Sequence, residues 1–222
     1  VQGGFVFVSG QLPIKPGATE HVIGSIEEQT EICLRNVERV LVAAPFYHMN
    51  ALCVTAFALA QGASTVLLRE FSAAAYLEAT ERWRCPWLTS VPTMMALVTR
   101  EEDLVRATDR SSVRRVSMGS APLTQSLVDR VRTAFPGATI TNGYGTTETG
   151  PVAFGPHPDG QPRPDTSLGY PAPGVRLRLA TDGRHDVDEG VLQIWTPALT
   201  PGYWNLADKT AAVMTTDGYY VA

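Results

Sequence analysis

Short apolar runs alternate with segments of helical periodicity through the middle of this 222-residue chain. The runs are rich in β-branched residues and are bounded by turn residues, a pattern typical of buried strands. They predict strands at 40–44, 64–68, 87–90, 113–118 and 139–141, and the periodic segments predict helices at 51–61, 73–83, 93–100 and 124–135. This alternation with short links indicates a parallel sheet covered by helices on both faces.

The two ends of the chain show different patterns. Residues 4–10 predict a strand between glycines, and a helix is predicted to begin at Ser25, which can cap it. Towards the other end, a Pro- and Gly-rich loop at 155–165 precedes predicted strands at 175–179 and 191–195, with no helix between them. Consecutive strands of this kind predict a small antiparallel or barrel-like subdomain.

Composition and charge exclude several classes of protein. The chain is 44% apolar and 18% charged, with a formal net charge of -4, as expected of a globular protein. Because Lys and Arg are not clustered, we expect no nucleic-acid partner. The most apolar window, 51–60, is too short for a membrane span. The three cysteines, Cys33, Cys53 and Cys85, are far apart and no signal peptide is visible, which favours buried free thiols and a cytoplasmic location.

The segment 141–150, Thr-Asn-Gly-Tyr-Gly-Thr-Thr-Glu-Thr-Gly, carries candidate binding groups directly after a predicted strand. Its glycines let the backbone approach a ligand closely, and its threonine hydroxyls can hydrogen-bond to phosphate oxygens. Tyr144 offers a flat face for a nucleobase, and Glu148 offers a carboxylate for Mg²⁺. Taken alone, the segment is equally compatible with a polar surface turn.

Residues from about 41 to 222 resemble the adenylate-forming (AMP-binding) superfamily of acyl-CoA synthetases, luciferases and peptide-synthetase adenylation domains. The Tyr-Gly-x-Thr-Glu core of that family matches residues 144–148. Other segments similar to the family follow in family order: Ala-Pro-Phe-Tyr-His-Met-Asn (44–50), Ser-Met-Gly-Ser-Ala-Pro-Leu (117–123), Gly-Tyr-Pro-Ala-Pro-Gly (169–174), Gly-Val-Leu-Gln-Ile (190–194), Pro-Gly-Tyr-Trp-Asn (201–205) and the run from Thr210 to Tyr220.

This resemblance implies roles for individual residues. His48 would help to position the acid, Thr147 would hydrogen-bond to the α-phosphate, and Glu148 would ligate Mg²⁺. The alternative for His48 is a satisfied polar residue at a strand end. The implied nucleotide-binding residues are Gly119, Ser120, Ala121, Asn142, Gly143, Tyr144, Gly145, Thr146 and Thr147.

The implied reaction has two steps. A carboxylate attacks the α-phosphorus of ATP and releases pyrophosphate, which leaves an acyl-adenylate. The thiol of CoA then attacks the acyl carbon and releases AMP. The resemblance therefore implies ATP or AMP, Mg²⁺ and CoA as cofactors or co-substrates, and a small carboxylic acid as substrate. The small residues after His48 favour an aliphatic or aryl acid over an amino acid.

Parts of the family pattern have no counterpart in the sequence. Nothing in 1–44 resembles the loop ending in Pro-Lys-Gly that holds the β- and γ-phosphates. The family's ribose-binding Asp and catalytic Lys are also missing. We therefore expect the chain alone to form adenylate weakly or not at all. The subdomain that packs on the sheet in this family is missing too, so we expect exposed sheet surface and self-association.

Residues 1–42 resemble a different family. The segments Phe-Val-Phe-Val-Ser-Gly-Gln-Leu-Pro-Ile (5–14), Gly-Ser-Ile-Glu-Glu-Gln-Thr (24–30) and Leu-Arg-Asn-Val (34–37) are similar to the Rid (YjgF-like) enamine/imine deaminases. The catalytic Arg of that family has no counterpart here. Two truncated families that meet near 40–44 suggest a rearranged, mispredicted or artificially joined sequence, that is, a chimera.

The sequence therefore predicts an α/β fold in three parts. A Rid-like strand–turn–helix segment (1–42) precedes an adenylate-forming α/β core (43–165) and a β-rich, barrel-like subdomain (166–222). Three functions remain open: a partial acid–CoA ligase, a Rid-type deaminase fragment and a non-catalytic nucleotide-binding remnant. ATP–pyrophosphate exchange and AMP binding would distinguish the first from the third, and loss of imine would indicate the second.

Overall fold

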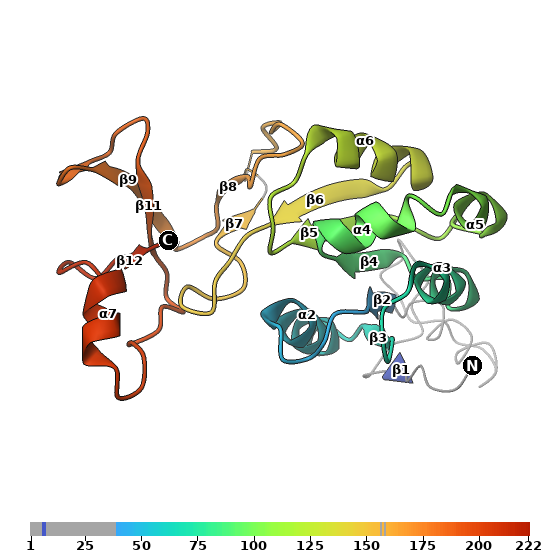
Figure 1. Ribbon diagram of the computed structural model, residues 1–222, viewed down its shortest axis with the longest axis horizontal. Helices are drawn as coiled ribbons and strands as arrows, with labels where there is room; N and C mark the ends of the chain where they lie inside the picture. Colours follow the sequence, from blue (N-terminus) through green and yellow to red (C-terminus); the bar gives the residue numbers. More distant parts are fainter. Residues whose placement is uncertain (1–5, 8–38, 156, 158) are drawn as a thin grey trace, which may run out of the picture. The chain divides into compact units, whose positions relative to one another are not determined.

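The computed structural model of the chain describes residues 6–7, 39–155, 157 and 159–222. By its internal contacts the chain forms two compact units, which divide between Thr141 and Asn142 (Figure 1). The helix predicted from Ser25 and nearly all of the Rid-like segment lie outside the described residues. The three-part division at 42/43 and 165/166 stays a prediction.

A six-stranded sheet organises unit 1, in the order β1-β3-β2-β4-β5-β6 (Figure 1). β2 pairs in parallel with β3 and β4, and β4 pairs in parallel with β5, whereas β1 is antiparallel to β3. The predicted parallel sheet is thus confirmed. The strands are Val6–Phe7 (β1), Arg39–Val42 (β2), Ser64–Leu67 (β3), Trp87–Ser90 (β4), Arg115–Gly119 (β5) and Thr139–Gly143 (β6), of which β6 runs into unit 2.

Helices connect these strands, and local chemistry fixes where some of them begin. Ser72 Oγ accepts a hydrogen bond from Ala75 N at 3.1 Å, and Thr124 Oγ1 accepts one from Leu127 N at 3.4 Å. The helices are Met49–Ala60 (α2), Ala73–Arg82 (α3), Pro92–Val98 (α4), Glu102–Ala107 (α5) and Gln125–Ala134 (α6). The sequence pattern does not predict α5, because a helix of 6 residues is too short to show a 3.6-residue repeat. Among the described helices, none has the length and apolar character needed to cross a membrane.

The hydrophobic core of unit 1 follows the two faces of the sheet. Successive side chains of a strand point to opposite faces. Leu41 of β2 is fully buried in the cluster that α3, α4, α5 and α6 cover. Its neighbours Val40 and Val42 pack on the other face against Ala51 and Ala58 of α2. Both faces of the sheet therefore carry helices, as the sequence predicts.

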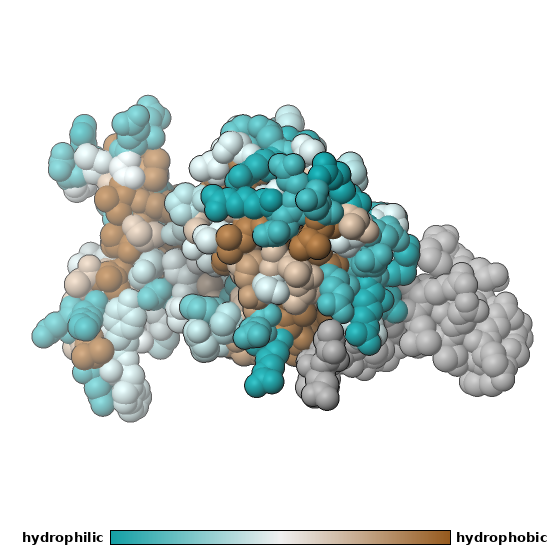
Figure 2. Space-filling model, turned by 45° about the vertical axis from the view of Figure 1, so that its right-hand side comes forward, coloured by the Kyte–Doolittle hydropathy of each residue, from teal (hydrophilic) through white to brown (hydrophobic). Residues whose placement is uncertain are grey.

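The outer side of α2 is also apolar. Leu52 and Phe57 are 54% and 59% exposed, and Phe46, just before the helix, is 44% exposed. In the view of Figure 2, apolar side chains reach the surface beside hydrophilic ones. These exposed apolar side chains lie on a helix that covers the sheet, and the expected exposed sheet surface stays a prediction. The expected self-association stays a prediction.

Two of the three cysteines belong to the described residues, and both are free thiols. Cys85 is fully buried, and this burial raises the pKa of its thiol to about 12. Cys53 on α2 is only partly buried, so the prediction of a buried thiol holds for Cys85 and is wrong for Cys53. Cys33 lies outside the described residues.

Unit 2 is built on antiparallel strands. A four-stranded sheet runs in the order β10-β9-β11-β12 with antiparallel pairs throughout, and β7 pairs antiparallel with β8. The antiparallel alternative is therefore confirmed, whereas closure into a barrel is not observed among the described strands. The elements are Phe154–Gly155 (β7), Tyr170–Pro171 (β8), Arg176–Thr181 (β9), Arg184–His185 (β10), Val191–Trp195 (β11), Ala207–Val213 (α7) and Tyr220–Val221 (β12). Helix α7 buries none of its residues, so no apolar stripe predicts it.

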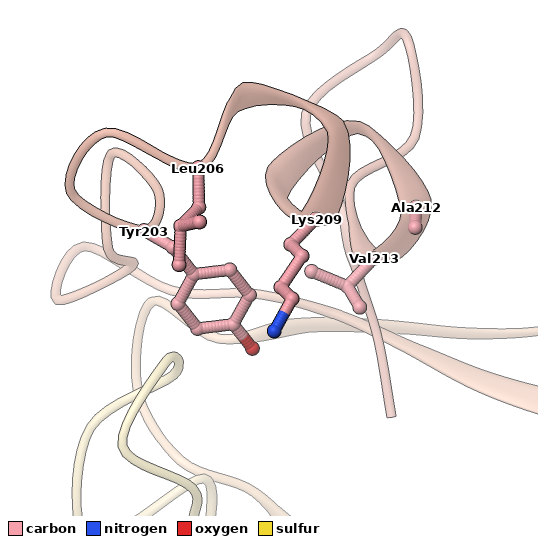
Figure 3. A pocket seen from close by; sticks show the side chains of 5 residues that line it. All are labelled: Tyr203, Leu206, Lys209, Ala212 and Val213. Carbon is pink, nitrogen blue, oxygen red and sulfur yellow. The ribbon is translucent and has the colours of Figure 1, made fainter.

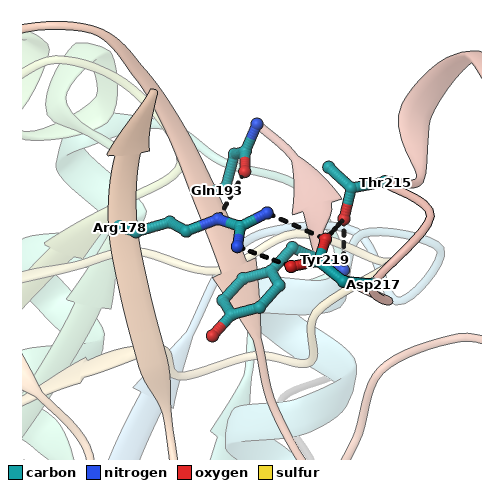
Figure 4. Close-up of polar contacts among 5 residues, drawn as sticks. All are labelled: Arg178, Gln193, Thr215, Asp217 and Tyr219. Atoms are coloured by element: carbon teal, nitrogen blue, oxygen red, sulfur yellow. Dashed lines mark hydrogen bonds and ion pairs between the residues drawn. The ribbon is translucent and has the colours of Figure 1, made fainter. Parts of the chain in front are cut away.

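A charged cluster joins β9, β11 and the turn before β12 (Figure 4). The Arg178 guanidinium donates to both carboxylate oxygens of Asp217, at 2.6 and 2.9 Å, and to Gln193 Oε1 at 2.6 Å. Thr215 Oγ1 donates to Asp217 at 2.7 Å, and the ring of Tyr219 lies 4.0 Å from the guanidinium carbon. Hydrogen bonds from Arg178, and then from Thr215, hold the pKa of Asp217 well below its usual range.

We expect Asp217→Asn to destabilise unit 2 at neutral pH and to have a shrinking effect in acid. The folded pKa of Asp217 is depressed, so its stabilising contribution is complete above the unfolded pKa of about 4 and is lost as pH falls towards the folded pKa. Urea midpoints of both proteins, measured from pH 7 down to pH 3, would check this. Asp188→Asn, at an exposed aspartate before β11, is the matched control. An unfolding difference that does not change with pH would contradict the prediction.

Candidate functional site

The segment after β6 folds into a tight turn in unit 2. An isolated bridge between Thr146 and Gly150 closes it. Thr149 Oγ1 accepts a hydrogen bond from Thr146 N at 3.2 Å, and Thr146 Oγ1 accepts one from Thr149 N at 3.1 Å. Gly150 has a φ of 87°, which side chains rarely adopt. The hydroxyls of Thr146 and Thr149 therefore stabilise the turn, whereas Thr147 is exposed to solvent.

Gly145 lies where the backbone of this turn passes closest to itself. A Cβ at this position would lie 2.4 Å from Gly150 O and 2.5 Å from the carbonyl carbon and oxygen of Pro151. These neighbours are backbone atoms, so a side chain could be accommodated only if the turn moved. A glycine at position 145 is therefore required for the turn that presents Thr147 and Glu148.

The segment after β11 fixes the backbone of the turn. Thr200 N donates to Glu148 O at 2.7 Å, and Thr196 Oγ1 donates to Thr149 O at 2.8 Å. Both Thr149 and Thr196 are buried. Paired backbone groups in a buried setting resist displacement, because each lost bond leaves an unsatisfied polar atom. The turn is thus held in place by other residues of unit 2, the unit to which it belongs.

The side chain of Glu148 is held by a tyrosine far along the sequence. Tyr203 donates its hydroxyl hydrogen to Glu148 Oε1 at 2.6 Å. This bond is the main cause that lowers the pKa of the Glu148 carboxyl, and it raises the pKa of Tyr203 to about 12. Burial, and then the charge of Glu148, raises the pKa of Tyr220. At neutral pH Glu148 is therefore a carboxylate beside neutral phenols.

Asn142, Gly143 and Tyr144 lead into the turn. The Tyr144 ring packs edge-on against Phe154, with ring centroids 5.6 Å apart and an interplanar angle of 83°. Asn142 is buried, and its Nδ2 donates to Thr166 O at 3.0 Å. The fold therefore uses one donor of Asn142, while Gly143, the last residue of β6, stays exposed.

The other predicted site residues lie in unit 1. His48 precedes α2 at the N-cap position, forms no side-chain capping bond and is exposed, with its ring 4.5 Å from that of Tyr47. Gly119 ends β5 and is buried, whereas Ser120, with a φ of 66°, and Ala121 are exposed. Because β2 and β5 belong to the parallel part of the sheet, both segments follow its carboxyl edge, where α/β proteins bind ligands.

Each unit therefore gathers part of the predicted site. Unit 1 brings His48 and residues 119–121 to one edge of its sheet, and unit 2 brings residues 142–148 together with Tyr203 and Tyr220. Sequence reasoning gave no role to these two tyrosines. Their only signal is that they fall within the segments 201–205 and 210–220, which carry the family resemblance.

A cavity of about 450 Å³ lies beside α7, with Tyr203 in its wall (Figure 3). The view shows the amine of Lys209 and the hydroxyl of Tyr203 on the same side of this cavity. The remaining lining is apolar: Leu206, Ala212 and Val213. Tyr203 therefore serves two purposes, because its ring lines the cavity while its hydroxyl contacts Glu148.

Comparison with known sequences adds independent observations. The sequence profile of a family described as "AMP-binding enzyme" matches residues 19–204. This match covers the turn, Gly119 to Ala121 and His48. It begins inside the segment for which the sequence suggests a Rid-like origin, and that Rid-like resemblance stays a prediction.

Individual relatives are ligases and a synthetase. 4-Coumarate–CoA ligase-like 6 of Oryza sativa subsp. japonica is 31% identical over 184 residues, which is 81% of this chain and 30% of that protein. Sulfoacetate–CoA ligase of Cupriavidus necator is 33% identical over 193 residues, or 85% and 37% of the two chains. The structure of amide bond synthetase McbA from Marinactinospora thermotolerans matches with a TM-score of 0.72 and 28% identity, over 84% of this chain and 38% of that one. The chain spans about a third of the length of these curated relatives.

Proposed function

We propose that this chain, which belongs to the AMP-binding enzyme family, forms the nucleotide-binding part of an ATP-dependent acid–CoA ligase. The sulfoacetate–CoA and 4-coumarate–CoA ligase names among its relatives support a carboxylic acid as substrate and CoA as acceptor. In this function the acid is activated as an acyl-adenylate with release of pyrophosphate, and its acyl group is then transferred to the thiol of CoA with release of AMP.

In this proposal the turn of unit 2 holds the nucleotide. Thr147 is exposed and donates its hydroxyl to the α-phosphate, while Tyr144 supplies a flat face for the adenine. Ser120 lines the acyl and adenine pockets with its neighbours 119 and 121, and His48 orients the acid. Preorganised donors of this kind stabilise the charge that develops on the phosphate during attack.

Magnesium fits the residues that are present if the nucleotide supplies further ligands. The described residues contain no group of three or more His, Cys, Asp and Glu side chains that could hold a metal. Mg²⁺ is often bound by one or two carboxylates, with phosphate oxygens and water completing its coordination. Glu148, charged and partly exposed, is such a carboxylate. The ion would neutralise phosphate charge.

The observation that carries the proposal is the turn at 145–150, which displays Thr147 and a charged Glu148 on a rigid support. We expect AMP to raise the melting temperature of the chain. Thr147→Ala should weaken AMP binding at least about tenfold, because a hydrogen bond to a charged group contributes about 1.5–3 kcal/mol. Thr216→Ala, at an exposed threonine of the same unit, should leave AMP binding unchanged. A thermal melt with and without AMP measures the first effect, and isothermal titration of wild type and both variants with AMP measures the affinities.

ATP–pyrophosphate exchange with a panel of carboxylic acids distinguishes catalysis from binding. Exchange that depends on one acid supports an acid–CoA ligase and names its substrate class. AMP binding without exchange supports the alternative of a non-catalytic nucleotide-binding remnant. A chain that binds no AMP, or whose Thr147→Ala and Thr216→Ala variants bind it equally, contradicts the assigned turn.

A further inference from the structure

We propose that Tyr203 is a positioning residue, which fixes the Glu148 carboxylate in the orientation that ligates the magnesium of a bound nucleotide. The inference rests on the proposed function and adds to it a residue to which no role has been given. It places the partner of the metal ligand 55 residues away along the chain, in the loop before α7. Tyr203 would act through Glu148 and would not touch the nucleotide.

The geometry around Glu148 supports this role, because one segment holds both its backbone and its side chain. Thr200 N donates to Glu148 O at 2.7 Å, and three residues further on Tyr203 donates to Oε1 at 2.6 Å. The first bond holds the backbone from which the glutamate side chain starts, and the second holds the carboxylate at its end. Hydrogen-bond partners that orient a ligand in this way typically change metal affinity 10–100-fold when they are removed.

Tyr203 is itself held in place. Its backbone N donates to Thr210 Oγ1 at 2.9 Å, which ties it to α7. The preceding residue, Gly202, has a φ of 137°, and a Cβ there would lie 2.6 Å from Thr210 Cγ2. A glycine is therefore needed to bring Tyr203 against the threonine, and the phenol hydroxyl is presented to Glu148 from a fixed base.

The carboxylate retains capacity for a metal ion while it accepts the bond from Tyr203. A carboxylate offers about four acceptor positions. Tyr203 occupies one of them, on Oε1. Because a phenol is a neutral donor, the negative charge needed to attract Mg²⁺ is preserved.

The test is a titration of Mg²⁺ into the whole chain at a fixed ATP concentration, and the quantity measured is the fraction of ATP that is bound. Tyr203→Phe removes only the hydroxyl, and we expect it to raise the Mg²⁺ concentration needed for half-maximal ATP binding roughly tenfold. AMP affinity in EDTA should stay unchanged. Tyr219→Phe, in the same unit, is the matched control and should behave as wild type, because the described contacts of Tyr219 are made by its ring and its backbone (Figure 4). In a Glu148→Gln background, Tyr203→Phe should have no further effect.

Each outcome decides the inference. An unchanged Mg²⁺ requirement in Tyr203→Phe overturns it, as does an equal loss of AMP affinity in EDTA, which marks a purely structural role. An additional loss in the Glu148→Gln background also overturns it. If Tyr203→Phe does not fold, Thr210→Val removes the hydroxyl that holds the backbone of Tyr203 and should raise the requirement in the same direction. Failure of the wild-type chain to bind AMP contradicts the proposed function itself, and the inference falls with it.

Discussion

Gly145→Ala is expected to weaken AMP binding at least about tenfold and to destabilise unit 2 by about 1–3 kcal/mol. The new Cβ would lie 2.4 Å from Gly150 O, inside any normal contact distance. The obstacle is backbone, which cannot rotate away as a side chain can. Relief requires the turn to open, and this would displace Thr147 and Glu148 together.

Gly155→Ala provides the matched control for this prediction. Gly155 lies in β7 of the same unit, and a Cβ there meets nothing within 4 Å. Its effect on unfolding should stay within about 0.5 kcal/mol, with AMP affinity unchanged. Isothermal titration with AMP and urea unfolding of both variants measure the contrast. If Gly145→Ala binds AMP as tightly as wild type, the turn is not the nucleotide site.

The strands were predictable where their signal is local. β4 and β11 lie at the predicted residues, 87–90 and 191–195, because both are short runs rich in β-branched and aromatic residues that follow a breaker, Pro86 or Gly190. Helices α5 and α7 were not predictable, because one is too short and the other buries nothing. The register in which strands pair, such as Leu41 opposite Leu88, was not predictable, because it depends on contacts between residues far apart in the sequence.

The candidate site divides in the same way. The turn at 145–150 was predictable as a feature, because closely spaced glycines and threonines point to close backbone approach and hydroxyl contacts. The partner of Glu148 was not, since the Tyr203 hydroxyl comes from 55 residues away and no spacing rule connects the two. The resemblance of 201–205 to the family identified the segment but not its contact. Energetic coupling of this kind appears only once the fold brings the two side chains within hydrogen-bonding distance.

Leu88→Ala is expected to destabilise unit 1 by about 2–5 kcal/mol. Leu88 is fully buried at the centre of β4, where its register partners are Leu41 of β2 and Val116 of β5. All three belong to one cluster beneath the helices of that face. Removing the isopropyl group leaves a cavity between the sheet and the helices that cover this face. The strands cannot shift to fill it without breaking the ladder, so the lost contacts are not fully recovered.

Leu97→Ala on α4 is the control for Leu88→Ala, because Leu97 is 43% exposed and its truncation should change unfolding by about 0.5 kcal/mol or less. Because the chain forms two compact units, a single melting temperature would not show which of them a substitution destabilises. Hydrogen exchange read by peptide separates them: Leu88→Ala should speed exchange in β2, β4 and β5 while β9 and β11 keep their protection. Since β2 and β5 lead into His48 and Ser120, loss of protection there would also loosen the unit 1 part of the site. Equal acceleration in both units would show instead that the two sheets unfold as one cooperative body.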